Sequence, residues 1–224
     1  MSKKALFVNA LTFARVPLIF LWAVFAVWQE FDAACGGRHA PSLTLAVLAA
    51  LGMLLSGLTD LWDGLLARRW NVVSTLGKMA DPLMDKVFYL VAFPVLVWHA
   101  AHSGAGELHT LSLLGLTVLY LLRDTWVTFL RSVGTMYGAD VGAMWLGKVR
   151  TALSFPGAGW IYVYLSFRWF DFLRVDNTLV NVVWPMSVMF VEALLAVLTF
   201  VSLVTYTRAY MPYLKRALEK KENL

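Results

Sequence analysis

The sequence is poor in the residues that stabilise small secreted domains and build soluble redox sites. Cys35 is the only cysteine among 224 residues, which excludes an intramolecular disulfide framework, a thiolate metal cluster and a paired-cysteine redox motif. Charged residues make up only 15% of the chain, and no repeat or low-complexity linker divides it. We therefore expect a single domain covering residues 1–224.

Apolar side chains, by contrast, are unusually abundant. Hydrophobic residues make up 60% of the sequence, with 10 Trp and 14 Phe. A soluble domain of this length could not bury so much apolar surface, because a folded monomer still exposes much of its chain. The net charge of +5 does not indicate nucleic acid, since the Lys and Arg residues flank apolar runs and form no basic face. The composition therefore predicts an integral membrane protein surrounded by lipids.

Six apolar stretches are long enough to cross a bilayer, which takes roughly 20 residues of helix. We predict an all-α bundle of six transmembrane helices. A short interfacial segment, Ser2–Leu11, is expected to precede it, because Lys3 and Lys4 lie there among apolar residues. The six predicted spans are Thr12–Trp28, Leu43–Ala67, Ala80–Ala100, Leu111–Leu130, Gly147–Phe167 and Val183–Tyr206.

The distribution of positive charge predicts the orientation of this bundle. If the N-terminus lies inside, only three of the 19 Lys and Arg residues, Arg38, Arg168 and Arg174, fall on the outer side. Lys and Arg near the ends of spans favour the cytoplasmic side of a membrane. Both termini are therefore expected in the cytoplasm.

Four aspartates interrupt the apolar helices near the predicted cytoplasmic surface. Asp60 and Asp63 lie at the end of the second span, and Asp81 and Asp85 at the start of the third. Residues three or four apart share a helix face, and a short turn should pack the two helices antiparallel, so the four carboxylates should converge. Mg²⁺ in proteins takes one or two carboxylates together with phosphate oxygens. The spacing predicts a divalent metal site for a phosphate-bearing substrate.

Small residues and an arginine accompany these aspartates. Gly64, Ala67 and Gly77 leave room for a ligand to approach the backbone, and Arg68 adds a cation suited to phosphate. Two other interpretations are disfavoured. Ion pairing of the aspartates with Arg68, Arg69 and Lys78 leaves acids in excess and rarely stabilises a buried site. A cation channel or transporter would spread its carboxylates through the membrane and not cluster them at one surface.

The complete motif resembles the signature of the CDP-alcohol phosphatidyltransferase family. From Asp60 to Asp85 the chain matches D-x2-D-G-x2-A-R-x8-G-x3-D-x3-D at all eight fixed positions. The resemblance implies an enzyme, often a homodimer, that uses two Mg²⁺ or Mn²⁺ ions to move a phosphatidyl group from a CDP-activated lipid to an alcohol. It implies a pocket for the CDP group shaped by Gly64, Ala67, Arg68 and Gly77. The assigned metal ligands are Asp60, Asp63, Asp81 and Asp85.

Asp85 is also the predicted general base. It lies one helical turn beyond Asp81 on the same face, and an alcohol must lose its proton as it attacks phosphorus. We expect direct displacement without a covalent intermediate, because no cysteine or Ser–His pair is placed to form one. The four histidines, which fall in or beside predicted outer loops, are His39, His99, His102 and His109.

A basic group further along the chain predicts the acceptor. Arg123 and Arg131 lie eight residues apart in the fourth span, and Lys148 opens the fifth, so these cations should bind an acceptor phosphate, although topology alone could also explain each charge. Arg123-Asp124, Arg131 and Gly147–Thr151 look like the corresponding residues of bacterial phosphatidylglycerophosphate synthases. That resemblance implies CDP-diacylglycerol as donor, sn-glycerol 3-phosphate as acceptor, and an active site facing the cytoplasm at the bacterial inner membrane. Inositol phosphate, serine, choline and phosphatidylglycerol remain alternative acceptors.

Overall fold

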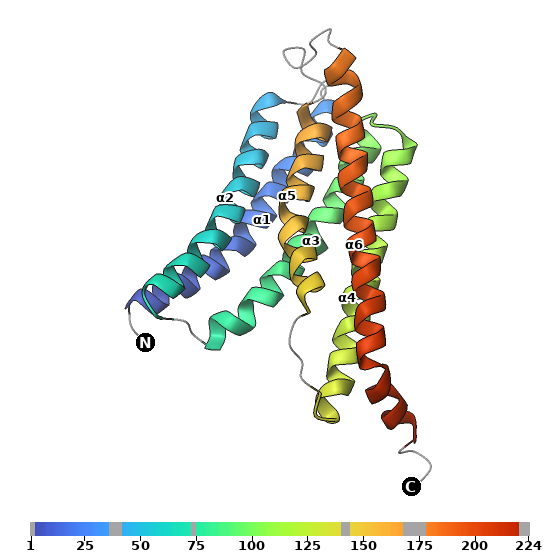
Figure 1. Ribbon diagram of the computed structural model, residues 1–224. Helices are drawn as coiled ribbons and strands as arrows, with labels where there is room; N and C mark the ends of the chain where they lie inside the picture. The colour runs from blue at the N-terminus through green and yellow to red at the C-terminus, as the bar shows by residue number, and fades with distance from the viewer. Residues whose placement is uncertain (1–2, 36–41, 73–74, 140–143, 168–177, 220–224) are drawn as a thin grey trace.

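The computed structural model describes residues 3–35, 42–72, 75–139, 144–167 and 178–219. Within these ranges the chain forms six α-helices and no strand (Figure 1). The all-α prediction is confirmed, and every predicted span lies inside one helix. The helices are α1 (Lys3–Cys35), α2 (Leu43–Arg69), α3 (Thr75–His102), α4 (Glu107–Met136), α5 (Trp145–Phe167) and α6 (Thr178–Glu219).

The predicted interfacial segment is continuous with the first helix. Ser2 lies outside the described residues, and from Lys3 onward the segment forms the first turns of α1, which continues unbroken to Cys35. Pro17 lies inside α1 and does not interrupt it. A proline removes one backbone hydrogen-bond donor, and the neighbouring turns can keep their own hydrogen bonds. α6 also extends beyond its predicted span, through Pro212 to Glu219.

Five helices of the described chain are long and apolar enough to cross a membrane by length and composition, namely α1, α2, α3, α4 and α6. The remaining helix, α5, has 23 residues and so spans about 34 Å, which is also sufficient. One of its faces is buried against other helices and includes Arg150, Ser154 and Ser166.

The helices form two groups joined by a central pair. α1 lies against α2 and α3, α4 lies against α6, and α3 and α5 connect the two groups (Figure 1). The first turn of α1 and the last turn of α6 lie at the same end of the bundle. Direct antiparallel packing of α2 on α3 was expected, but these helices make almost no contact in the described chain, because α1 packs between them.

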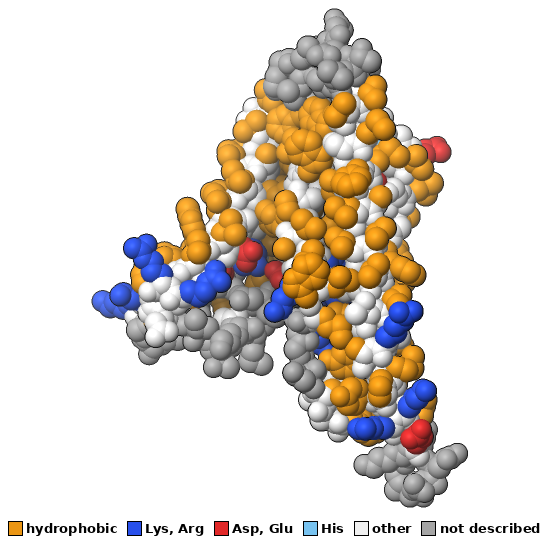
Figure 2. Space-filling view, viewed as in Figure 1, with side chains coloured by type: hydrophobic (Ala, Val, Ile, Leu, Met, Phe, Trp, Pro, Cys, Tyr) orange, Lys and Arg blue, Asp and Glu red, His pale blue; other side chains and the backbone are white. Residues whose placement is uncertain are grey.

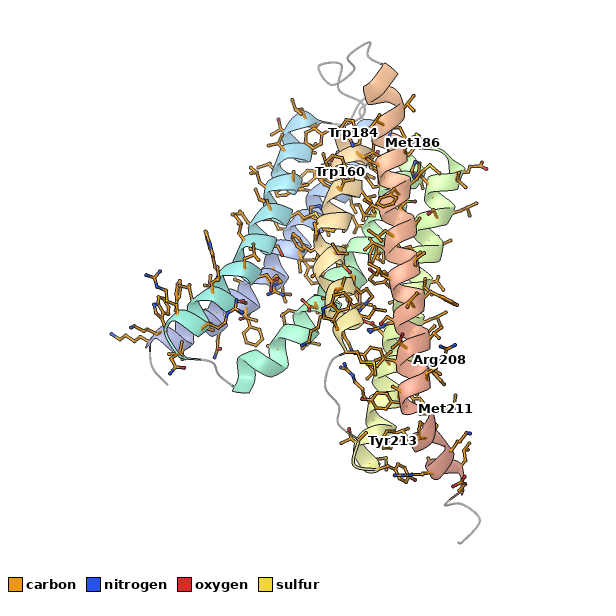
Figure 3. All side chains as sticks on the ribbon, viewed as in Figure 1. Trp160, Trp184, Met186, Arg208, Met211 and Tyr213 are labelled. Carbon is orange, nitrogen blue, oxygen red and sulfur yellow. The ribbon has the colours of Figure 1, made fainter. Side chains whose placement is uncertain are left out.

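Aromatic residues lie toward both ends of α6 (Figure 3). At one end, the Trp184 ring of α6 lies edge-on to Tyr164, with centroids 5.7 Å apart, and Trp160 Nε1 donates to Ser187 Oγ at 3.0 Å. At the other end α6 carries Arg208 and Tyr213. Trp, Tyr and Arg at the ends of an apolar segment are typical of helices that cross a bilayer.

The orientation can be tested with single cysteines in a Cys35→Ser background. Glu107, exposed at the start of α4, suits this test better than the buried Ser103 beside it. Because most basic residues lie at the opposite end, Glu107→Cys is expected to react with a membrane-impermeant maleimide on intact cells. Lys3→Cys, also exposed, is expected to react only in inverted vesicles. The reverse pattern of labelling would show that the termini face outward.

Candidate active site

One cavity of about 500 Å³ collects side chains from all six helices. It lies toward the end where α1 begins and α6 ends. Figure 2 shows acidic and basic side chains gathered where the two helix groups separate, below a surface that is mostly hydrophobic. The predicted site residues that line this cavity are Asp60, Asp63, Gly64, Asp85, Arg123, Arg131 and Lys148.

The acidic half of the cavity is organised by Arg15 of α1. Its guanidinium contacts Asp60 through Nη2, and lies 3.4 Å from Asp63 Oδ2 and 3.4 Å from Asp85 Oδ1. The Arg15 side chain is only 3% exposed, whereas those of Asp60 and Asp85 are 51% and 36% exposed. One buried cation thus holds carboxylates from α2 and α3 together across the helix that separates them.

Arg15 is a site residue to which the sequence analysis assigned no role in the site. The signal was present, because a single arginine inside an apolar span is costly and is a functional candidate by default. Arg68 and Arg69, which the alternative of ion pairing invoked, both have exposed side chains. The side chains of Lys78 and Asp81 lie outside the described part of α3.

The carboxylates fit a hard divalent cation by their chemistry and convergence. Asp60, Asp63 and Asp85 contribute only oxygen atoms, and all three reach the same guanidinium. The three aspartate side chains are arranged around Arg15. In this arrangement, no three His, Cys, Asp or Glu residues of the described chain form a group that could hold a metal ion. A metal at this point would share these oxygens with Arg15 or replace some of its contacts.

The residues expected around the CDP group are only partly brought to the cavity. Gly64 lines it, and a Cβ built there would meet only Arg68 Nη2, at 3.8 Å, so the wall is open at this point. Ala67, Arg68 and Gly77 do not line the cavity. Arg68 lies in the last turn of α2, with its side chain exposed.

The basic half of the cavity is held by Asp124 of α4. Its Oδ1 accepts from Arg123 Nη1 at 2.8 Å and from Arg150 Nη2 at 3.0 Å. All three side chains are buried, and Arg150 also lies over the Tyr120 ring, 4.6 Å from its centroid. Arg150 Nε and Nη1 have no hydrogen-bond partner in the described protein. The arrangement leaves cationic donors available to an anion in the cavity.

The described residues include a Ser–His pair, which lies away from the cavity. His99 Nε2 lies 2.9 Å from Ser166 Oγ, and His99 Nδ1 lies 2.8 Å from Glu30 Oε1. Sequence spacing could not reveal this contact, because it joins α1, α3 and α5. His99 and Ser166 are fully buried and do not line the cavity. The cluster therefore connects three helices, away from the converging charges.

Comparison with known proteins agrees with this arrangement. A model of the CDP-alcohol phosphatidyltransferase family matches residues 6–201. A cardiolipin synthase (CMP-forming) from Streptomyces coelicolor is 33% identical over 166 residues, covering 68% of this chain and 67% of that protein. A CDP-diacylglycerol–glycerol-3-phosphate 3-phosphatidyltransferase from Salmonella choleraesuis is 30% identical over 152 residues, covering 67% of this chain and 73% of its own length.

A protein of the same name from Escherichia coli K12 is 31% identical over 113 residues, which cover 50% of this chain and 59% of that relative. These relatives, together with the apolar helices, indicate a multi-pass membrane protein. The family match extends over most of the sequence and includes at least part of every helix. This chain is a member of the CDP-alcohol phosphatidyltransferase family.

Proposed function

We propose that this chain transfers the phosphatidyl group of CDP-diacylglycerol to sn-glycerol 3-phosphate, releasing phosphatidylglycerophosphate and CMP. The observation that carries the proposal is a single cavity lined by both the motif aspartates and Arg123, Arg131 and Lys148. The names of the Salmonella and E. coli relatives support the same reaction. The proposed setting is the cytoplasmic face of the bacterial inner membrane, with the protein as a homodimer.

The acidic half of the cavity is assigned to the donor. Asp60, Asp63, Asp81 and Asp85 would hold Mg²⁺ or Mn²⁺, and the bound metal would neutralise the pyrophosphate and the departing CMP. By family resemblance, Gly64, Ala67, Arg68 and Gly77 shape the pocket for the CDP group. Gly64 supports this assignment by its position on the open wall of the cavity.

The basic half is assigned to the acceptor. Glycerol 3-phosphate carries a compact dianion, which matches guanidinium donors and the point charge of Lys148. With its phosphate held there, the acceptor hydroxyl would face the acidic half, and its oxygen would bond to the lipid-side phosphorus as the bond to CMP breaks. Asp85 would take the hydroxyl proton. The geometry supports this role, because Asp85 lines the cavity and is partly accessible.

A second acceptor has support from one specific comparison. The Streptomyces relative is named as a cardiolipin synthase, which implies phosphatidylglycerol in place of glycerol 3-phosphate. Both acceptors carry a phosphate and a primary alcohol, so the same cationic groups suit either. They differ in size and solubility, and a direct assay distinguishes them.

The acceptor assay supplies purified protein with CDP-diacylglycerol, Mg²⁺ and one candidate alcohol at a time. We expect release of CMP with glycerol 3-phosphate and little with serine or choline, because the cavity presents several cations to an acceptor that carries a phosphate. Release with inositol phosphate and not with glycerol 3-phosphate would reject the choice of glycerol 3-phosphate. The measurement is CMP released and lipid product identified by mass. Product formed only with phosphatidylglycerol would favour the second candidate, and product formed only with serine or choline would reject both.

Asp85→Asn tests the proposed general base. The amide cannot accept the proton, so kcat is expected to fall by roughly 10²- to 10⁴-fold. Binding of CDP-diacylglycerol and of Mn²⁺ is measured separately on the same folded protein, with the exposed and distant Glu107→Gln as control. Turnover close to wild type would exclude Asp85 as the base. Collapse of donor binding would instead make Asp85 chiefly a metal ligand.

Arg15→Gln tests whether the carboxylate cluster binds metal. Loss of the guanidinium leaves the carboxylates without this cation, and we expect destabilisation of about 2 kcal/mol in metal-free buffer, moderated by the exposure of Asp60 and Asp85. Because Mg²⁺ could then neutralise the same oxygens, it should raise the Tm of Arg15→Gln more than that of wild type. Arg69→Gln, at an exposed arginine, is the control. Equal effects of Mg²⁺ on all three proteins would argue against a metal at this cluster.

A further inference from the structure

Tyr206 of α6 is buried at the wall of the cavity and is not part of any motif in the sequence. It is 1% exposed, and its hydroxyl oxygen accepts from Arg131 Nη2 at 3.0 Å and from the backbone N–H of Met144 at 2.9 Å. A tyrosine hydroxyl has two acceptor lone pairs, so it can serve both donors at once. The hydroxyl therefore joins α4 to the residue just before α5.

The ring of Tyr206 also contacts both arginines assigned to the acceptor. Arg123 Cζ lies 5.0 Å and Arg131 Cζ 5.3 Å from the ring centroid, within the range of cation–π attraction. One turn earlier on α6, Ser202 Oγ accepts from Arg123 Nη2 at 2.7 Å and from Nε at 3.1 Å. Two like charges are thus held close together by neutral groups of a single helix.

The start of α5 approaches the same tyrosine closely. A Cβ built on Gly147 would lie 3.0 Å from the Tyr206 hydroxyl and 3.2 Å from Arg123 Nη2, so this position tolerates little beyond hydrogen. Lys148 follows Gly147 directly and lines the cavity. Tyr206 therefore touches Arg123, Arg131 and the segment that carries Lys148, which come from two different helices.

We propose that Tyr206 is a positioning residue of the acceptor pocket, which fixes the two guanidinium groups and the start of α5 for an acceptor that carries a phosphate. This inference rests on the proposed function. Long arginine side chains lose considerable conformational entropy when a ligand orders them, and groups already held in place lose less. Tyr206 lowers that cost before the acceptor binds, so its effect falls on the acceptor and not on the CDP-lipid.

Tyr206→Phe is the closing experiment, because it removes the hydroxyl and keeps the ring over the arginines. Loss of a hydrogen bond to a charged group should raise KM for glycerol 3-phosphate by about tenfold. KM for CDP-diacylglycerol and kcat should stay within about twofold of wild type. Tyr162→Phe is the matched control, since the Tyr162 hydroxyl is also buried but bonds Gln29, and Tyr162 does not line the cavity. It should leave both KM values unchanged.

A double-mutant cycle with Arg131→Gln shows whether Tyr206 acts through that arginine. If it does, Tyr206→Phe should cause little further rise in KM for glycerol 3-phosphate when Arg131 has already been replaced by Gln. Full additivity, an unchanged KM for the acceptor, or equal changes in both KM values would overturn the proposal. Should Tyr206→Phe not fold, Gly147→Ala replaces it in the same cycle, because its Cβ would crowd the Tyr206 hydroxyl. Its Cβ would also crowd Arg123, so the decision rests on the cycle, and full additivity of Gly147→Ala with Arg131→Gln would overturn the proposal.

The wild-type acceptor assay separates this proposal from the proposed function. If the wild type uses glycerol 3-phosphate and Tyr206→Phe is normal, only the role of Tyr206 is rejected. If the wild type uses another phosphate-bearing acceptor, the choice of glycerol 3-phosphate fails, and KM for that acceptor then decides the role of Tyr206. Turnover only with an acceptor that lacks phosphate would reject both.

Discussion

The contact of one buried arginine with three aspartates is the interaction on which the arrangement of the bundle depends. Carboxylates on α2 and α3 would repel one another at short range in a poorly polar medium. Arg15 supplies an opposite charge from α1, and α1 accordingly lies between the two helices that carry the motif. The same contact brings these carboxylates together in the acidic half of the cavity, so one charge serves both the packing of the helices and the proposed site.

In the opposite half of the cavity, several cations lie close together and need groups that reduce their repulsion. Asp124 bridges Arg123 and Arg150, and Tyr206 lies against Arg123 and Arg131. The aspartates of one half are therefore arranged around the cation of Arg15. The arginines of the other half are arranged around the carboxylate of Asp124 and the neutral ring of Tyr206. In the proposed reaction an anionic acceptor would meet the cations of this half directly, whereas an anionic donor would need bound metal, because three aspartates outnumber Arg15 in the other half.

Local sequence patterns predicted those structural features that depend on residues close together in the chain. Helix positions followed from apolar runs, and the position of Asp60 and Asp63 on one stripe followed from helical periodicity. Contacts between distant segments were not predictable in this way. The insertion of α1 between α2 and α3 needed Arg15 to be interpreted as a partner and not as a topology charge. Tyr206 gave no signal at all, since one tyrosine in an apolar helix is ordinary, and its role depends on residues 62 and 75 positions away.

The position of Arg15 in the first helix matters during synthesis. Chains emerge N-terminus first, so α1 reaches the membrane before α2 and α3 are complete. The cation that pairs with Asp60 and Asp63 is then already present when those aspartates arrive, and they need not enter apolar surroundings uncompensated. An α2–α3 hairpin made without α1 would lack that guanidinium. Of the four groups in this contact, the guanidinium that compensates the aspartates is therefore the first to be synthesised.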